Sequence, residues 1–462
     1  MSLFRGKRPY EAAALGLIGC AMFLPEKLEL DPPLLPPFDK VSIPALGTFA
    51  GAMIWARAKL ARAGALRGVD LLFVIALCMN VFTVINNGDQ VPNAYPMGKP
   101  LPLFDIFSQA VRDIPRIFFP FFVGRALLTS RRDLNDFMRI MVMAGVIYSF
   151  FAMIELRLSP QLHRWIYGYH QHNFAQTIRS DGYRPMVFMT HGLNASRFML
   201  MTLLAATALY KAKQKVWNVS CGWWVIYLSI ILVLWKSTGA TLLAAVVVPI
   251  MILTGFKNQL RFAVLLAMFV IIYPALRTGG MIPIEDILDW VAENVDPMRA
   301  KSLEDRFEQE DALLGKLVQK PLAGWGGDGR YNIFDPITRE KQTVDPEWLL
   351  VFGKRGLVGL ACLWGLYLFP VFLSYLRADQ CRKDDAAALA GFAVIIAVVT
   401  FDNLLNSTGT LPQYFMAGSL VGAATNLPRQ RQAERRAARR ERLRAAHEPE
   451  PEPEEREPAP AQ

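Results

Sequence analysis

The chain contains one long polar segment, which includes SLEDRFEQEDALLGKLVQKPLAGWGGDGRY (Ser302–Tyr331) and TVDPEWLLVFGKRGLVGL (Thr343–Leu360). This segment, 277–356, lies between two stretches that are apolar enough to sit in lipid. Most of the sequence before and after it is similarly apolar. We therefore expect a helical membrane bundle with one long insertion, and we expect the chemistry to take place on or beside that insertion.

The composition is typical of a polytopic membrane protein. Of the 462 residues, 53% are hydrophobic and only 19% are charged. The net charge of +10 comes from basic residues in short loops between apolar blocks, which argues against nucleic-acid binding and for orientation of membrane spans. The five cysteines lie in or beside apolar stretches, so neither a disulfide framework nor a thiolate metal site is predicted.

Apolar blocks long enough to cross a bilayer recur along the chain. We count twelve, at about 11–24, 41–57, 69–86, 104–123, 136–155, 193–210, 217–235, 239–255, 260–276, 357–376, 386–404 and 410–426. The first is short, and the fourth carries Arg112, Asp113 and Arg116, so these two match the pattern least well. The basic MSLFRGKRPY that leads into the first block predicts a retained span and not a cleaved signal.

Basic residues occur in every second loop. They lie near residues 5–8, 57–67, 125–132, 211–215, 257–261 and 377–383 and in the tail. Because Lys and Arg accumulate on the cytoplasmic side, these loops and both termini are predicted to be cytoplasmic. The segment 277–356 then faces outward, between the ninth and tenth spans.

The C-terminal end forms a separate region, 428–462, after a membrane unit that spans 1–427. Residues 429–444 are rich in arginine, and the sequence that follows is acidic and rich in proline. One interpretation is an anchor on anionic lipid followed by a disordered end. The alternative is a docking site for a cytoplasmic partner.

The first half of the insertion predicts a helix over the outer membrane face. Ser302 and Asp305 have the spacing of a capping box, and apolar residues continue at helical spacing up to Pro321. Arg306 would lie in the first turns, with its guanidinium directed at the mouth of the bundle. The alternative is an ordinary surface pair between Arg306 and Glu310.

A glycine-rich loop, LAGWGGDGRY, follows Pro321. Gly324 and Gly326 permit positive backbone angles, and the loop ends at Arg330. Such a loop can present several N–H groups to an anion, although glycine-rich turns without a ligand are common.

Asp345 and Glu347 precede the next span and place two carboxylates at the outer interface. Either one is a candidate to accept a proton from a hydroxyl group. The alternative is a helix N-terminus with Asp345 as the cap, Pro346 at the first position and Glu347 in the first turn.

A second outward segment, 156–196, contains RPMVFMTHGLNASRFM. Arg184, His191 and Arg197 there enter the sixth span together, and Lys236 lies at a similar predicted depth. A cation buried in the membrane is costly unless it meets an anion, so these residues are candidates for anion binding. The alternative for the arginines is that they extend to the interface. The histidines of this segment have no zinc-site spacing.

These stretches resemble the O-antigen ligases and the Wzy-type polysaccharide polymerases. RFEQEDALLGKLVQKPLAGWGGDGRY is similar to the family's arginine, helix and Pro-Leu-x-Gly-x-Gly segment, in which Arg306 matches an arginine that holds a lipid-linked diphosphate. EWLLVFGKRGLVGL and RPMVFMTHGLN resemble two further family stretches. The chain departs from the family in lacking the ligase histidine before EWLLVF and in having Thr238 where a phosphate-binding arginine is usual.

The resemblance implies an all-α, GT-C-like fold with about twelve spans and a helical periplasmic loop. It also implies a metal-independent, inverting glycosyltransferase of the bacterial inner membrane that polymerises undecaprenyl-diphosphate-linked oligosaccharide without a cofactor. In that expectation Asp345, Glu347 and His191 are catalytic, and Arg306, Arg184, Arg197 and Lys236 bind the diphosphate. Chain-length regulators or export proteins are implied as partners.

Two other functions remain open. The first is a ligase that moves a finished glycan to a lipid or protein. The second is a transporter or flippase of lipid-linked oligosaccharide, for which charged or helix-breaking residues at the midplane of several spans are expected.

Overall fold

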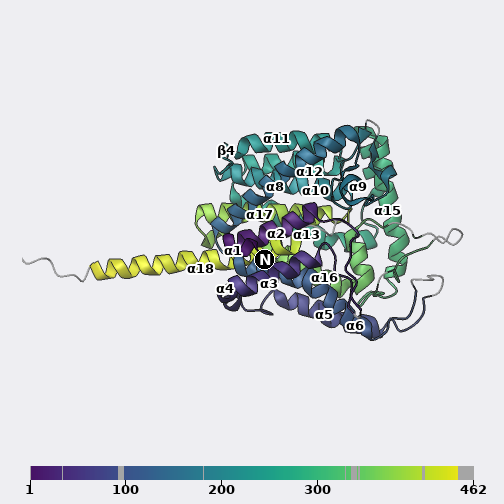
Figure 1. Ribbon diagram of the computed structural model, residues 1–462, viewed down its shortest axis with the longest axis horizontal. Helices are drawn as coiled ribbons and strands as arrows, with labels where there is room; N and C mark the ends of the chain where they lie inside the picture. The colour runs from purple at the N-terminus through teal and green to yellow at the C-terminus, as the bar shows by residue number, and fades with distance from the viewer. Residues whose placement is uncertain are drawn as a thin grey trace, which may run out of the picture.

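The computed structural model describes residues 2–33, 35–91, 98–179, 182–327, 329–334, 341, 344–407 and 412–445. Over these residues the chain is a bundle of helices with two short hairpins (Figure 1). The predicted all-α class is confirmed. The acidic, proline-rich sequence after residue 445 lies outside the described residues.

Every predicted apolar block falls on a helix. Eleven of the blocks match α2 (Pro9–Phe23), α3 (Ser42–Trp55), α5 (Asp70–Ile85), α8 (Arg131–Leu158), α10 (Gly192–Lys211), α11 (Cys221–Leu234), α12 (Thr238–Leu253), α13 (Phe256–Thr278), α16 (Glu347–Arg377), α17 (Lys383–Asp402) and α18 (Gln413–Ala445). The fourth block, 104–123, is split over α6 (Phe104–Asp113), the π-helical turn η1 (Ile114–Phe118) and α7 (Phe119–Leu127).

Five of the helices are long and apolar enough to cross a membrane: α8, α10, α13, α16 with its short continuation, and α17. Five shorter apolar helices, α2, α3, α5, α11 and α12, lie beside them. These helices indicate a membrane-embedded protein. The count of twelve spans stays a prediction.

Short elements connect the apolar helices. They are α1 (Leu3–Gly6), α4 (Arg57–Ala63), α9 (Leu162–Tyr167), η2 (Phe174–Thr177), α14 (Ile284–Asn294), α15 (Pro297–Leu317) and η3 (Ala378–Gln380). The hairpins pair β1 (Ile178–Arg179) with β2 (Gly182–Tyr183) and β3 (Lys215–Val216) with β4 (Val219–Ser220), both antiparallel.

The interior of the bundle is built around α10, of whose apolar window 94% is buried against α8, α11, α12 and α17. A second close contact joins α7 and α18. A Cβ on Gly418 would lie 1.9 Å from the carbonyl oxygen of Phe121, and one on Gly422 would lie 2.4 Å from that of Arg125. The small-xxx-small spacing of the two glycines therefore lets the two backbones touch, as at many helix interfaces in membranes.

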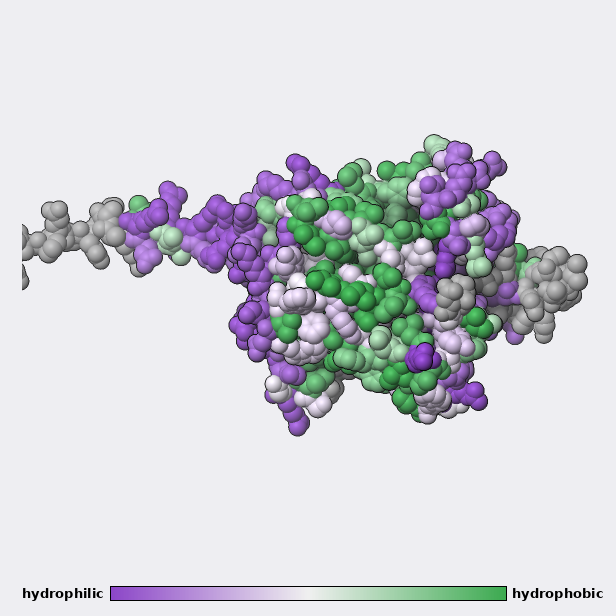
Figure 2. Space-filling view, turned by 90° about the horizontal axis from the view of Figure 1, so that it is seen from above, coloured by the Kyte–Doolittle hydropathy of each residue, from purple (hydrophilic) through white to green (hydrophobic). Residues whose placement is uncertain are grey.

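The two ends of the bundle differ in what they carry. Figure 1 shows α4, β4 and the far half of α18 at one end, and α6, α9 and α15 at the other. In the face seen in Figure 2, apolar side chains gather in a broad central region and polar side chains concentrate at both ends. An apolar region between two polar ends is the distribution that a bilayer requires.

Helix α15 lies across one end of the bundle (Figure 1). The predicted start at Ser302 is wrong, because the helix begins five residues earlier, where Asp296 accepts hydrogen bonds from the N–H groups of Met298 (2.8 Å) and Arg299 (3.2 Å). Pro297, at the first helical position, has its backbone angle already set for a helix. These two residues give a stronger start signal than the pair chosen from sequence.

Glu310 fastens α15 to the bundle. Its fully buried carboxylate accepts hydrogen bonds from Arg277 Nε (2.8 Å), the Tyr273 hydroxyl (3.0 Å) and Trp348 Nε1 (3.2 Å). Burial raises the pKa of Glu310, and the hydrogen bonds from Arg277 and Trp348 oppose that rise. The surface pair of Glu310 with Arg306 is therefore not formed, because Glu310 points into the bundle.

Helix α18 continues as one helix past the boundary predicted at residue 427. Its last turns extend beyond the bundle roughly along the direction of the other helices (Figure 1). Arg431 donates to the carbonyl oxygens of Asp379 (3.2 Å) and Cys381, and Arg382 pairs with Glu434. These contacts hold the first basic turn against the bundle, while the described side chains beyond it are exposed.

Candidate functional site

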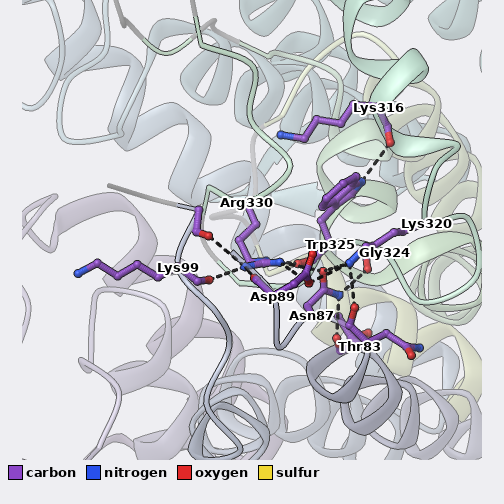
Figure 3. Close-up of polar contacts among 11 residues, drawn as sticks. Thr83, Asn87, Asp89, Lys99, Lys316, Lys320, Gly324, Trp325 and Arg330 are labelled. Carbon is purple, nitrogen blue, oxygen red and sulfur yellow. Dashed lines mark hydrogen bonds and ion pairs between the residues drawn. The ribbon is translucent and has the colours of Figure 1, made fainter. Parts of the chain in front are cut away.

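Arg330 is buried between the polar insertion and the loop that follows α5 (Figure 3). Its Nη1 donates to the carbonyl oxygens of Asp89 (2.9 Å), Gly98 (3.3 Å) and Lys99, and its Nε donates to that of Trp325 (3.1 Å). Backbone carbonyl oxygens thus accept these hydrogen bonds of Arg330, a residue predicted to belong to a ligand-binding loop. Arg330 ties two loops together instead.

The glycine-rich loop packs against the first turns of α16. The N–H of Trp325 donates to the carbonyl oxygen of Gly353 (2.7 Å), and that of Gly326 donates to the carbonyl oxygen of Lys354 (3.1 Å). Gly324 has φ +71°, and a Cβ there would collide with the backbone of α16. The N–H groups of Trp325 and Gly326 thus donate to α16, and that of Gly324 donates to the carbonyl oxygen of Lys320 (3.0 Å), so the geometry does not support the predicted anion-binding role of Gly324 and Gly326.

The contact depends on a break in α16 at Gly356, which has φ 68° and ψ −176°. The N–H of Leu357 donates to the carbonyl oxygen of Pro321 (2.8 Å), and a Cβ on Gly356 would lie 2.1 Å from the carbonyl oxygen of Leu322. Only glycine adopts this backbone conformation readily. The break lets the insertion sit beside Lys354 and Arg355, which precede it.

Arg306 and Asp345, predicted as diphosphate ligand and candidate base, lie together. Arg306 Nε is 3.8 Å from Asp345 Oδ2, and this nitrogen makes no hydrogen bond among the described residues. The N–H of Asp345 donates to Gln309 Oε1 (3.3 Å). The predicted cap is displaced by one residue, since α16 begins at Glu347 and its N-cap position is Pro346.

The two other predicted arginines are buried in α10 and its approach. Arg197 pairs with Asp402 at the end of α17, with Nη2 2.6 Å from Oδ2, so this cation already has an anion within the protein. Arg184 packs over Gly192, where a Cβ would lie 2.3 Å from Arg184 Cδ. Both side chains are almost fully buried, so neither extends to the interface as the alternative required.

His191 and Lys236 lie near these arginines in sequence or predicted depth but have local contacts. His191 is the N-cap of α10: its Nδ1 accepts from the N–H of Leu193 (3.1 Å), and its Nε2 lies 3.2 Å from Gln176 Oε1. Lys236 Nζ lies beside Gly182 of the first hairpin. The geometry supports a capping role for His191, and no group of metal-binding side chains occurs among the described residues.

A polar cavity of about 250 Å³ lies between η1, α16 and the start of α18. Four cationic and two acidic side chains line it, together with two tyrosines and two glutamines: Arg112, Arg116, Lys354 and Arg355; Asp113 and Glu347; Tyr367 and Tyr414; Gln109 and Gln413. Of the predicted site residues, Glu347 belongs to this lining.

Arg355 and Arg116 each pair with a carboxylate beside the cavity. Arg355 Nη2 lies 2.7 Å from Asp113, and its Nη1 donates to Asn80 Oδ1 (2.9 Å). Arg116 pairs with Asp39, while its Nε makes no hydrogen bond among the described residues. The lining thus brings four cationic and two acidic side chains around one space, and cations gathered in this way can meet an anionic group.

The local sequence explains how these charges face one cavity. Pro115 lies in the π-helical turn η1, which widens the helix between Arg112 and Arg116. Turns of this kind are inserted mostly where function requires a helix to be distorted. On the opposite side, Lys354 and Arg355 end the first part of α16 at its break. An interrupted helix therefore contributes each half of the cationic lining.

Sequence reasoning missed Arg112, Arg116, Lys354 and Arg355. The signal was present, because an ionisable residue inside an apolar block is a functional candidate by default. The charges in the fourth block were instead taken as evidence of a weak span. Lys354 and Arg355 were quoted only as part of a family-like stretch, so their position opposite Arg112 could not be anticipated.

No protein-family model matches the chain, and no curated protein matches it. Its function is therefore argued from its own residues and geometry.

Proposed function

We propose that this chain is a membrane glycosyltransferase that polymerises lipid-linked oligosaccharide repeat units. The donor would be a growing glycan on undecaprenyl diphosphate, and the acceptor a sugar hydroxyl of the next repeat unit. One observation carries the proposal: a cavity inside the bundle has four cationic side chains and a carboxylate, Glu347, around one space. A diphosphate leaving group and a base for a hydroxyl group need this combination.

The proposed orientation follows from the distribution of basic residues. The end with α4, β4 and the extension of α18 carries the arginine-rich and lysine-rich loops, so it is the cytoplasmic end under the positive-inside rule. The end with α6 and α15, from which the cavity residues of η1 and α16 come, is then periplasmic. We propose with this orientation that the chain has twelve spans and two cytoplasmic termini and lies in the bacterial inner membrane.

The chemistry is a displacement at the anomeric carbon. The acceptor oxygen forms the new glycosidic bond, the bond between the anomeric carbon and the phosphate oxygen breaks, and the configuration inverts. Fixed cations stabilise the negative charge that develops on the departing diphosphate. The hydroxyl proton passes to Glu347, which lines the cavity, and not to Asp345, whose carboxylate faces Arg306.

The cations with this role are Arg112, Arg116, Lys354 and Arg355. They replace the predicted set in part, because Arg197 is already neutralised by Asp402. Arg306 remains a candidate for the approach of the donor, since its only carboxylate contact among the described residues is the long one to Asp345. Arg184 and Lys236 are not among the described residues that line the cavity, so they are not assigned to the donor site.

The test uses purified full-length protein in lipid nanodiscs with a short lipid-linked oligosaccharide. Longer glycans on the lipid are the expected product. Glu347→Gln should reduce this product by about a hundredfold or more, as for removal of a general base. The matched control is Glu304→Gln, which changes an exposed carboxylate that pairs with Lys301 on α15 and should leave the rate unchanged.

Two outcomes would overturn the proposal. Transfer of the glycan to a different acceptor would make the chain a ligase. Unchanged donor that appears in the opposite leaflet of a vesicle would make it a transporter. Inorganic pyrophosphate should compete with the donor, and the competition should weaken in Lys354→Ala if the cationic lining binds the diphosphate.

A further inference from the structure

Buried amides without partners gather where α16 begins and α17 ends. Asn403 is fully buried, and neither its Oδ1 nor its Nδ2 makes a hydrogen bond among the described residues. Gln413 is 6% exposed, and its Nε2 is likewise without a partner there. Leaving such a group buried without a hydrogen-bond partner is energetically costly. Amides of this kind in one place therefore indicate a polar ligand that completes them.

Gln413 and Glu347 both line the polar cavity, and the N–H of Glu347 donates to the carbonyl oxygen of Asn403 (3.1 Å). Glu347 Oε2 is also buried without a hydrogen-bond partner among the described residues. Two lining residues thus keep unused hydrogen-bonding atoms at the cavity, and Asn403 keeps its own next to Glu347.

The chemistry of these residues differs from that of the cations in the lining. Carboxamides supply both donors and acceptors, and a carboxylate supplies acceptors, so together they match hydroxyl groups better than phosphate oxygens. Tyr414 follows Gln413 and stacks on Tyr367, with ring centroids 4.6 Å apart, and both rings line the cavity. An aromatic surface beside amides suits a ring that has an apolar face and polar edges.

The nearest charged pair does not alter that preference. Arg197 and Asp402 lie within electrostatic range of Glu347 but neutralise each other across 2.6 Å. The cations of the lining come from the end of α6 (Arg112), from η1 (Arg116) and from the end of the first part of α16 (Lys354 and Arg355). Gln413 and Glu347 come instead from the first residues of α18 and α16.

We propose that Glu347, Asn403, Gln413 and Tyr414 form a subsite for the neutral, hydroxylated ring of the acceptor sugar. This inference rests on the proposed function, because it places the attacking hydroxyl next to the proposed base. Gln413 and Asn403 are positioning residues that hold the ring through at least two hydroxyl groups. Diphosphate binding belongs to the cations of the cavity lining and does not require Gln413 or Asn403.

The first experiment measures transfer by the full-length protein with a fixed lipid-linked donor and a soluble oligosaccharide acceptor. Gln413→Leu should raise the KM for the acceptor about tenfold or more, with the KM for the donor nearly unchanged. Gln413→Glu preserves the size of the side chain but removes the donor N–H groups, and it should also raise the acceptor KM. Gln432→Leu, an exposed position on the same helix, is the matched control.

A second experiment, which measures binding and not transfer, separates this inference from the proposed function. Binding of glucose, galactose, mannose and N-acetylglucosamine to the wild-type protein is followed by saturation-transfer NMR, and inorganic pyrophosphate is titrated in parallel. At least one sugar should bind to the wild type and lose its signal in Gln413→Leu, while pyrophosphate binds equally to both. This result would support the subsite even if no transfer were observed.

The inference is overturned if none of the four sugars binds the wild type more strongly than it binds Gln413→Leu and Gln413→Glu. It is also overturned if both variants raise the KM for donor and acceptor equally, since a merely structural role would disturb both. Asn403→Ser provides an independent variant, because it replaces one amide by a smaller hydroxyl group and adds no volume to the buried site.

Discussion

Arg330 and the cations of the polar cavity differ in what surrounds their positive charges. Arg330 is enclosed by carbonyl oxygens of Asp89, Lys99 and Trp325, so its donors are used within the protein. The cavity cations instead line a space of about 250 Å³, together with Asp113 and Glu347. The first arrangement stabilises the fold, whereas the second leaves capacity for a ligand.

The difference shows that burial of an arginine does not by itself indicate an anion site. A guanidinium presents five N–H donors, and at Arg330 backbone carbonyls take most of the contacts, with the Asp89 carboxylate 3.4 Å from Nη2. An arginine whose neighbours leave an open polar volume is the better candidate. The variants below test whether the two clusters behave as differently as their surroundings predict.

The largest effect is expected from Arg330→Ala. The substitution leaves several buried carbonyl oxygens without donors, each at about 1–3 kcal/mol, so the free energy of unfolding should fall by more than about 3 kcal/mol. Thermal unfolding in detergent, followed by tryptophan fluorescence, measures the loss. Lys99→Ala is the control, because Lys99 contributes its carbonyl oxygen while its side chain points away from Arg330 (Figure 3). An equal loss of stability in both variants would contradict the structural role of the Arg330 side chain.

The next effect concerns the pair of Arg355 and Asp113 beside the cavity. Arg355→Ala leaves a carboxylate that is only 5% exposed without its cation, which should cost about 2–3 kcal/mol. Asp113→Ala in the same chain should recover a large part of that cost. A double-mutant cycle by thermal unfolding gives the coupling, and strict additivity of the two single losses would show that the pair is not formed.

How much the sequence could predict depends on the kind of signal. Apolar blocks located every described helix that is long and apolar enough to cross a membrane, because burial in lipid imposes a composition that a single sequence displays directly. Pairings such as Arg355 with Asp113 join residues far apart in the chain, and no local pattern encodes them. Arg330 was assigned to a ligand loop because glycines surround it. Three of its carbonyl partners, at Asp89, Gly98 and Lys99, come from another loop, whose backbone atoms carry no residue-specific signal.

A smaller effect should appear in the pH dependence of the loop near Arg330. Burial, with a smaller effect from Arg330, lowers the pKa of Lys316 to about 8, and its Nζ donates to the carbonyl oxygen of Asn332 (2.8 Å). The unfolded chain therefore holds this proton more tightly than the folded one, and stability rises as the pH increases from about 8 towards the ordinary lysine value.

Lys316 is half-buried, so solvent screening should limit the rise to about 1 kcal/mol. The measurement compares the unfolding temperature at pH 7.5 and pH 10 for the wild type and Lys316→Met. The difference between the two pH values should shrink in the variant and stay unchanged in Lys301→Met, which removes an exposed lysine of the same helix. An unchanged difference in Lys316→Met would show that other groups cause the pH dependence.

The smallest effect on stability is expected from Arg306→Ala, and it separates the two kinds of cation most sharply. Arg306 is 3.8 Å from a half-exposed Asp345, and such a pair contributes about 0.5 kcal/mol or less. The protein should thus insert and unfold as the wild type does. Polymer formation should nevertheless be lost if Arg306 guides the diphosphate towards the cavity, because the donor would then lose a cation that contributes little to stability. Full-length polymer from Arg306→Ala would remove this residue from the site and leave the cavity cations to bind the donor alone.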